Sequence, residues 1–353
     1  MKTLRALSFL AFLPVFACGA ESPAGPTDAA PPSDAAPDVA VDAAPTEGAA
    51  PDASAPLAAM ATPRSLFGAV ACDDGRVRVL AGYGPLSLLS SVEAYDEPTN
   101  AWTTGTPATL HRYAHAVAKS SDGDVYVIGG TSDGETPIGE VDVYSPKTDS
   151  WSTAPALPTA RLGLAAATAN DGRIFVLGGG ASPDDATGVV EVYSPDTKTW
   201  TTGPTMPTAR LGLQVVTGSD GLIYAISGRD AEKNPLGAVE ALDPVAGTWT
   251  TMPSLPVPRY WFGAALVPDG RVLVLGGVND DGFLDDVEAL APGASSWSEL
   301  QPLPETRGWL SAAVTPSGRV LAIGGSTDDG IAGQPPPLAT MFAYDAAKDV
   351  WTK

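Results

Sequence analysis

Cysteine and histidine are nearly absent from this sequence, with two of each among 353 residues. Two cysteines cannot staple a domain with several disulfides, so Cys72, inside an apolar run, is expected to be a buried free thiol. Two histidines are too few for a histidine-rich metal site. No phosphate-binding loop, nucleophile elbow or zinc helix motif is present either. These gaps argue against the common enzyme classes, and we expect neither a cofactor nor a metal.

Basic residues are scarce as well. The 20 Lys and Arg residues are outnumbered by 41 Asp and Glu, which gives a formal net charge of -21. Such a surface repels nucleic-acid phosphates and anionic lipid headgroups. We therefore expect no nucleic-acid partner, and membrane contact only through a covalent lipid.

Long hydrophobic runs are missing beyond the first residues of the chain. A short basic start precedes an apolar run over 6–17 that is too short to span a bilayer. The letters VFACG at 15–19 resemble the lipobox of bacterial lipoproteins, in which the cysteine is lipidated. We expect residues 1–17 to be a signal peptide and Cys18 to carry lipid at the outer membrane or cell surface. The alternative is secretory cleavage near Ala20, which would release the protein.

Residues 18–62 are rich in Ala, Pro and Asp, and no Lys, Arg or aromatic residue occurs among them. Sequence of this kind buries too little apolar surface to offset the entropy of ordering. Proline and mutual repulsion of the acids favour an extended conformation. We expect an acidic tether that holds a folded domain away from a membrane.

Six copies of one pattern fill the rest of the sequence. Each copy has an arginine, a glycine 18 positions later, and then a tryptophan. The arginines are Arg64, Arg112, Arg161, Arg210, Arg259 and Arg307. The glycines are Gly82, Gly130, Gly179, Gly228, Gly277 and Gly325. The tryptophans are Trp102, Trp151, Trp200, Trp249, Trp297 and Trp351. A period of about 49 residues is typical of a repeat architecture.

One copy contains four short strands. In the third copy, apolar runs over 161–168, 173–179 and 189–193 are followed by a short strand that starts at Trp200. Asn170-Asp171-Gly172, between the first two runs, predicts a two-residue type I′ hairpin turn. The unit therefore reads as a four-stranded antiparallel sheet.

Six such sheets predict an all-β fold, a six-bladed β-propeller over 63–353. A helical solenoid would need a 3.6-residue period, and a large sandwich would not explain the constant spacing. The pattern begins at a first strand and ends at a fourth, so we expect the ring to close by packing of blade 1 against blade 6. The blades are predicted at about 64–104, 112–153, 161–202, 210–251, 259–300 and 307–353.

The residues of the unit resemble the kelch repeats. That motif joins an arginine before the first strand, a double glycine after the second, and an aromatic residue seven positions ahead of a tryptophan. The double glycine is intact in four copies and becomes Ala81-Gly82 and Ser227-Gly228 in the other two. The resemblance covers all of 64–353 and implies a kelch-type propeller. It also implies a structural role for His115, because kelch repeats often carry histidine at that position.

An acid recurs on the third strand in register with each arginine, except in the sixth copy, where Phe342 takes its place. A charge repeated in every blade could line a ligand site. Scaffolding repeats in every blade, however, whereas a binding site uses the blades unequally. We interpret the arginine–acid series as structural. The acids are Glu93, Asp142, Glu191, Glu240 and Glu288.

Positions where the blades differ are better candidates for function. Two residues after its arginine, the kelch motif implies glycine, but this sequence has Trp261 and Trp309 in blades 5 and 6. Tyr260 and Tyr113 stand one place earlier in their blades. These strand starts are expected near the central channel, where aromatic rings could stack on a sugar or a peptide side chain. The alternative is that the indoles fill space between blades.

The loops after the glycines also differ between blades, and they carry Arg229, Asp280, Asp281, Asp328 and Asp329. Their oxygens could bind Ca²⁺, but the loops lack the alternating ligand ladder of a calcium loop and are expected to be solvated. Loops on a rigid scaffold often carry function, so we include these residues in the candidate face.

The sequence predicts a non-enzymatic binding module, expected to be monomeric, for a protein, peptide or glycan at the bacterial cell envelope. The alternative is a carbohydrate-active propeller similar to kelch-type sugar epimerases and mutarotases. That alternative requires a deep central pocket in which an arginine and a carboxylate lie together.

Overall fold

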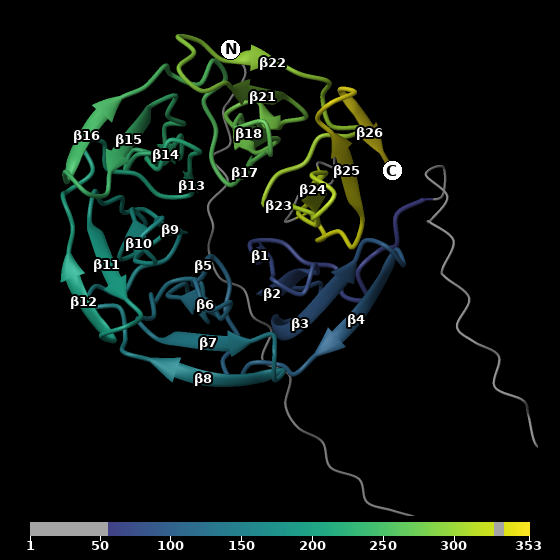
Figure 1. Cartoon of the computed structure of the whole chain (residues 1–353), viewed down its shortest axis with the longest axis horizontal. Helices are drawn as coiled ribbons and strands as arrows, with labels where there is room; N and C mark the ends of the chain where they lie inside the picture. Colours follow the sequence, from purple (N-terminus) through teal and green to yellow (C-terminus); the bar gives the residue numbers. More distant parts are fainter. Residues whose placement is uncertain (1–55, 328–334) are drawn as a thin grey trace, which may run out of the picture. The chain divides into compact units, whose positions relative to one another are not determined.

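The computed structural model describes residues 56–327 and 335–353, in which every regular element is a β-strand. Six four-stranded antiparallel sheets form blades around a central axis, as Figure 1 shows. The first strand of each blade lies nearest the axis and the fourth lies at the rim. The predicted six-bladed propeller is therefore confirmed. Cys18, Asp328 and Asp329 lie outside the described residues.

Each blade uses four strands that follow one another along the chain, and blade 5 has an added hairpin. Blades 1 and 2 contain β1 (Gly68–Ala71), β2 (Val77–Tyr83), β3 (Leu88–Asp96), β4 (Ala101–Gly105), β5 (Ala116–Lys119), β6 (Val125–Ile128), β7 (Val141–Ser145) and β8 (Ser150–Ala154). Blades 3 and 4 contain β9 (Ala165–Thr168), β10 (Ile174–Leu177), β11 (Val190–Ser194), β12 (Thr199–Thr202), β13 (Gln214–Thr217), β14 (Ile223–Ile226), β15 (Val239–Asp243) and β16 (Thr248–Thr251). Blades 5 and 6 contain β17 (Gly263–Leu266), β18 (Val272–Leu275), the added hairpin β19 (Val278–Asn279) and β20 (Gly282–Phe283), β21 (Val287–Leu290), β22 (Ser298–Glu299), β23 (Ser311–Val314), β24 (Val320–Ile323), β25 (Met341–Asp345) and β26 (Val350–Thr352).

The core lies between neighbouring blades. All four residues of β10 are buried, because each face of the strand packs on another blade. One apolar cluster joins Phe175 and Leu177 of blade 3 to Leu213 and Ile223 of blade 4. Burial on both faces explains why the second strands are continuous apolar runs. Cys72 is buried and free, as expected.

The turn between β9 and β10 differs from the prediction. Asn170, Asp171 and Gly172 form a three-residue loop, and of these three only Gly172 has positive φ, at 85°. Its N–H donates to the Ala169 carbonyl, and the Ala169 N–H donates to the Arg173 carbonyl, both at 2.9 Å. A type I′ turn would need positive φ at two residues. The predicted two-residue type I′ turn is therefore wrong.

The repeated arginines anchor the blades from inside. The Arg161 guanidinium donates to the carbonyls of Gly178 at 2.5 Å and Val189 at 3.1 Å. It also donates to the Glu191 carboxylate at 2.8 Å. All six arginines are at most 1% exposed. A guanidinium at this depth needs its charge paired and its N–H groups bonded, so each arginine fixes the third strand of its blade.

Blade 6 replaces the missing acid with a ring. The guanidinium carbon of Arg307 lies 4.3 Å from the centroid of the Phe342 ring, which gives a cation–π contact. Glu305, in the preceding link, pairs with the charge. Thr340 accepts a further N–H at 3.0 Å. The break at Phe342 is therefore a local exchange of partners around the same arginine.

The repeated tryptophans fasten each blade to the link before it. Trp200 lies opposite Tyr193 in the β11–β12 ladder, with ring centroids 5.0 Å apart. Its indole N–H donates to the Pro155 carbonyl at 2.8 Å. The corresponding bonds join Trp102 to Ala58, Trp151 to Thr106, Trp249 to Pro204, Trp297 to Pro253 and Trp351 to Gln301. Each tryptophan thus contacts both its blade and the link, which explains the constant spacing.

Residues 56–63, which we name the clasp, close the ring on the side of blade 6. The Leu57 N–H donates to the Lys353 carbonyl at 3.0 Å. The Met60 N–H donates to the Ala339 carbonyl at 2.9 Å, and the Met60 side chain is 3% exposed in the apolar core. The clasp thus takes the place that a link between blades has elsewhere in the ring.

The clasp is also bonded to blade 1. The Ala58 carbonyl accepts the indole N–H of Trp102 at 2.9 Å. Glu93, the partner of the first arginine, accepts the N–H groups of Ala61 at 2.7 Å and Thr62 at 3.1 Å. The predicted boundary at residue 63 therefore falls too late, since 56–62 are part of the propeller. The ring closes through these bonds as well as by packing.

Candidate ligand-binding face

Six backbone hydrogen bonds form a closed ring around the propeller axis. The residue two places after each repeated arginine donates its N–H to the same position of a neighbouring blade, at 2.8 to 3.0 Å. All six positions have positive φ, from 51° to 65°. The ring therefore joins every blade through left-handed backbone. Its members, in order, are Leu66, Trp309, Trp261, Gly212, Gly163 and Ala114.

Left-handed backbone explains why the kelch motif has glycine at these positions. Glycine takes positive φ without strain, whereas a residue with a Cβ is disfavoured by about 1–2 kcal/mol. Trp261 has φ 51° and Trp309 has φ 57°. Strain of this kind persists where the side chain does something that glycine cannot do. Four of the six ring positions carry a Cβ, and the two indoles are the largest of these departures from glycine.

The Trp261 indole lies over the glycines of two other blades. A Cβ added to Gly163 would be 3.0 Å from its Cη2 atom, and one added to Gly212 would be 3.2 Å from its Cδ2 atom. Glycine in blades 3 and 4 thus leaves the space that the indole of blade 5 occupies. The Trp261 side chain remains partly exposed.

Trp309 lies deeper, under the added hairpin of blade 5. Phe283, from β20, meets it edge-on with ring centroids 5.2 Å apart. Both belong to one apolar cluster, which we name the aromatic cap. Its buried members are Leu66, Tyr113, Ala114 and Trp309, and its partly buried members are Tyr83, Leu88, Trp261, Val278 and Phe283.

Three of the aromatic residues predicted from the sequence, Tyr113, Trp261 and Trp309, belong to this cluster, and Tyr260 is bridged through its backbone to the cap residue Val278. Tyr113 and Trp309 are each 8% exposed. Tyr260 and Trp261 are partly exposed, so a ligand could stack on them without any rearrangement. Phe283 was not predicted as a site residue, although it stands close in the sequence to the blade 5 acids, in a loop that differs from those of the other blades.

Tyr260 and Arg229 form a cation–π contact at the edge of the cap. The guanidinium carbon of Arg229 lies 5.3 Å from the Tyr260 ring centroid. Burial raises the pKa of Tyr260, and Arg229 opposes that rise. Burial, with Tyr83 and Asp133 nearby, raises the pKa of Tyr113 to about 12. Both phenols therefore stay neutral at physiological pH and act by stacking and hydrogen bonding.

A cavity of about 140 Å³ follows the ring along the axis, between the first strands of all six blades. His115 is the one ionisable residue in its lining, together with the polar Gln214 and Ser311. Arginine and carboxylate groups are absent from that lining. The lining of this cavity thus contains no arginine–carboxylate pair of the kind that the carbohydrate-active alternative requires.

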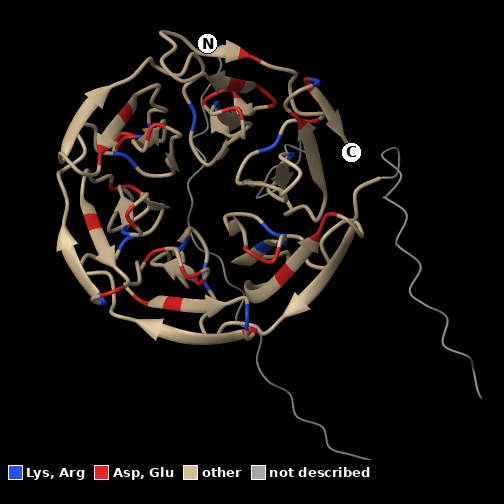
Figure 2. Cartoon of the chain, in the orientation of Figure 1, with Lys and Arg blue, Asp and Glu red and all other residues tan. Residues whose placement is uncertain are grey.

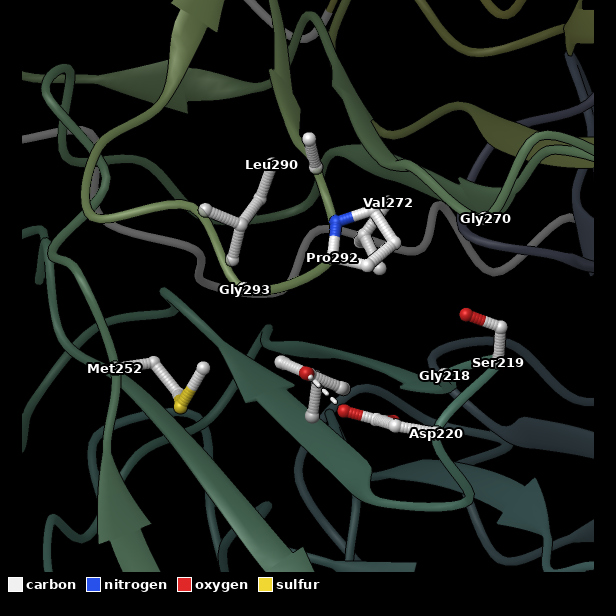
Figure 3. Close-up of a pocket in the computed structure, with 11 residues that line it drawn as sticks. Gly218, Ser219, Asp220, Met252, Gly270, Val272, Leu290, Pro292 and Gly293 are labelled. Atoms are coloured by element: carbon white, nitrogen blue, oxygen red, sulfur yellow. Dashed lines mark hydrogen bonds between the residues drawn. The ribbon is translucent and has the colours of Figure 1, made fainter.

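Two other hollows lie at the opposite end of the blades. The crevice in Figure 3 has about 10 Å³, room for roughly one water, and its Asp220 carboxylate accepts the Tyr224 hydroxyl at 2.7 Å. The hollow between blades 3 and 4 has about 400 Å³. Its Asp171 and Asp243 carboxylates accept N–H groups of their own turns. Tyr224 is the one aromatic residue in these two linings, so neither hollow has a cluster of rings like the cap.

Within residues 56–327 and 335–353, no group of three or more His, Cys, Asp or Glu side chains is placed to hold a metal ion. The same residues contain no helix long and apolar enough to cross a bilayer.

The sheets, the buried arginines and the closed backbone ring define a six-bladed β-propeller whose blades share one repeat. The KLHDC2/KLHL20/DRC7 Kelch-repeats domain matches residues 165–353, and the Kelch motif matches residues 112–158. The chain belongs to the kelch-repeat family. Kelch propellers generally mediate protein interactions.

Known proteins are similar to this chain in sequence over short segments and, in one solved structure, in fold. Kelch-like protein 41a of Danio rerio is 43% identical over 74 residues, which is 21% of this chain and 12% of that protein. Kelch-like protein 40 of Xenopus tropicalis is 37% identical over 84 residues, 24% of this chain and 13% of that protein. The match thus spans about an eighth of each relative. The solved structure of YjhT has a TM-score of 0.70 at 19% identity, and the match covers 84% of this chain and 99% of that one.

Proposed function

We propose that this protein is an interaction module that binds a peptide segment of a partner protein at the face formed by the aromatic cap. One observation carries the proposal: Trp261, a member of the aromatic cap, is held at positive φ and remains partly exposed. Indoles in such places are frequent hot spots of protein interfaces. The absence of an arginine–carboxylate pair from the lining of the central cavity favours binding over sugar chemistry.

Replacing Trp261 by glycine separates binding from folding. We expect the free energy of unfolding to stay within about 1 kcal/mol, because relief of the left-handed strain offsets the lost indole contacts. Affinity for the ligand should fall at least about tenfold. Wild type and Trp261→Gly are compared on a random peptide library displayed on phage and on a glycan array, with thermal unfolding measured in parallel.

Val245→Ala is the matched control, since Val245 is 88% exposed at the opposite end of the blades. It should leave both binding and stability unchanged. Peptides that bind Trp261→Gly as well as wild type would contradict the proposed site. Trp261-dependent binding to glycans alone would replace the peptide by a sugar.

We propose further that the propeller is displayed at the cell envelope by lipid on Cys18, as the sequence around that residue suggests. Cys18→Ser should move the protein from the membrane fraction to the soluble extracytoplasmic fraction, because one thioether-linked anchor is lost. Detergent partitioning of the two forms measures this. Unchanged fractionation would rule out the anchor and leave the binding proposal untouched.

A further inference from the structure

We infer that the face recognises a positively charged side chain, Lys or Arg, carried by the partner peptide next to an apolar residue. This inference rests on the proposed function and names the chemistry of its ligand. The cation would lie between the tip of the β19–β20 hairpin and the exposed rings of Tyr260 and Trp261. Three observations support it.

The first observation is a pair of free carboxylates on a fixed support. Asp280 and Asp281 are exposed at the tip of the hairpin, and neither is in an ion pair within the described structure. The hairpin itself is held in place, since Val278 pairs with Phe283 and the Asn279 side chain accepts the Asp281 N–H at 2.9 Å. Because the backbone that carries the two carboxylates is fixed, binding a cation would order only two short side chains.

The second observation is that a ring of this face already binds a cation. Tyr260 stacks with the Arg229 guanidinium at 5.3 Å. Asp280 is close enough to Tyr260 to affect its pKa. Aromatic faces bordered by carboxylates attract ammonium and guanidinium groups through the ring quadrupole and the negative charge together. Trp261 offers a further, partly exposed ring beside this pair.

The third observation is that acids outnumber bases in the loops of this face. The Arg229 Nη2 group donates to the Pro183 carbonyl at 2.6 Å, and Lys233 pairs with Asp184 at 2.7 Å. The loops 131–137, 180–187, 229–236 and 278–284 contain eight acids and these two bases. Acidic residues are spread over the whole propeller in Figure 2. The resulting potential attracts a cationic segment and repels an anionic one.

The apolar part of the ligand follows from the cap. Trp261, Val278 and Phe283 are partly buried, and they form a continuous apolar surface beside the hairpin tip. A leucine or aromatic side chain next to the cation would cover it, as the centre of an interface usually is covered. A neutral sugar would leave the two carboxylates without a partner, so the peptide fits better.

The test uses the full-length protein and the Trp261-dependent peptides of the phage library described above. We expect Lys and Arg to be enriched severalfold over the starting library, next to an apolar position. Exchange of the Arg in the best peptide for citrulline, which keeps the shape and removes the charge, should weaken binding about tenfold or more. Raising the salt from 50 to 500 mM should weaken it as well.

The double variant Asp280→Asn/Asp281→Asn should lose about tenfold in affinity for the same peptide, with unchanged thermal unfolding. Asp196→Asn, an exposed acid at the opposite end of blade 3, is the control and should bind like wild type. Trp261-dependent peptides without Lys or Arg enrichment, or equal binding of the citrulline form, would overturn this inference and leave the peptide-binding function standing. Absence of any Trp261-dependent peptide would overturn both.

Discussion

A chain that begins at residue 64, without the clasp, should lose more than about 5 kcal/mol of its free energy of unfolding. Burial of Met60 alone is expected to contribute about 2–5 kcal/mol, and each lost hydrogen bond about 1 kcal/mol. Typical domains have only about 5–15 kcal/mol in total. The ring would then open between blades 6 and 1. Thermal unfolding, compared with a chain that begins at residue 56, measures the loss.

Point changes in the clasp provide the control for that truncation. Met60→Ala removes one buried side chain and keeps the backbone bonds, so its loss should be an intermediate one. If both truncated chains melted at the same temperature, the clasp would have no part in closing the ring. Packing of blade 1 on blade 6 would then suffice.

Acid should weaken the propeller through His115. Its side chain is buried, and neither ring nitrogen has a hydrogen-bond partner of good geometry, although the Leu80 carbonyl lies nearby. Burial, and secondarily the charge of Arg112, lower its pKa to about 3, against a weaker opposing effect of the Leu80 carbonyl. The unfolded chain binds a proton near pH 6.5, whereas the folded chain stays neutral to about pH 3. The contribution of neutral His115 to the free energy of unfolding is thus complete above pH 6.5 and declines as the pH falls towards 3.

The size of this effect follows from the two pKa values. By pH 4.5 the loss should be about 2–3 kcal/mol relative to pH 7.5. His115→Leu should remove that part of the pH dependence, because the corresponding position is apolar and buried in every other blade. Those residues are Phe67, Leu164, Leu213, Phe262 and Leu310. Denaturant titrations of both forms at the two pH values isolate the histidine from the many carboxylates. Parallel loss of stability in both would contradict the assignment.

The period of the repeat predicted the architecture because each repeated residue makes corresponding contacts in every blade. Arg161 needs carbonyls and a carboxylate at fixed places in its blade, and Trp200 needs a carbonyl of the preceding link. These contacts determine the intervals at which the repeated residues occur in the sequence. The same logic located the diverged positions Trp261 and Trp309, since left-handed backbone makes glycine the expected residue there.

Two features could not be predicted for reasons of tertiary context. The clasp lies ahead of the first arginine and shares the Pro- and Ala-rich composition of the preceding residues, so its pairing with Lys353 leaves no local signal. Burial of Trp309 depends on Phe283, which a two-strand hairpin brings over from blade 5. The turn at Gly172 was also predicted wrongly, because the same residues are compatible with a two-residue and with a three-residue hairpin loop.

The clasp also determines the order in which the molecule can be completed. Leu57 is among the first residues of the propeller to be synthesised, and its partner Lys353 directly follows β26, the last strand of blade 6. Middle blades can form from contacts within one or two repeats as the chain emerges from the ribosome. The bond between Leu57 and Lys353, in contrast, joins the two ends of the propeller and must wait until blade 6 has been synthesised. Until then the apolar sides of blades 1 and 6 are uncovered, which makes the last step of assembly the one most exposed to aggregation.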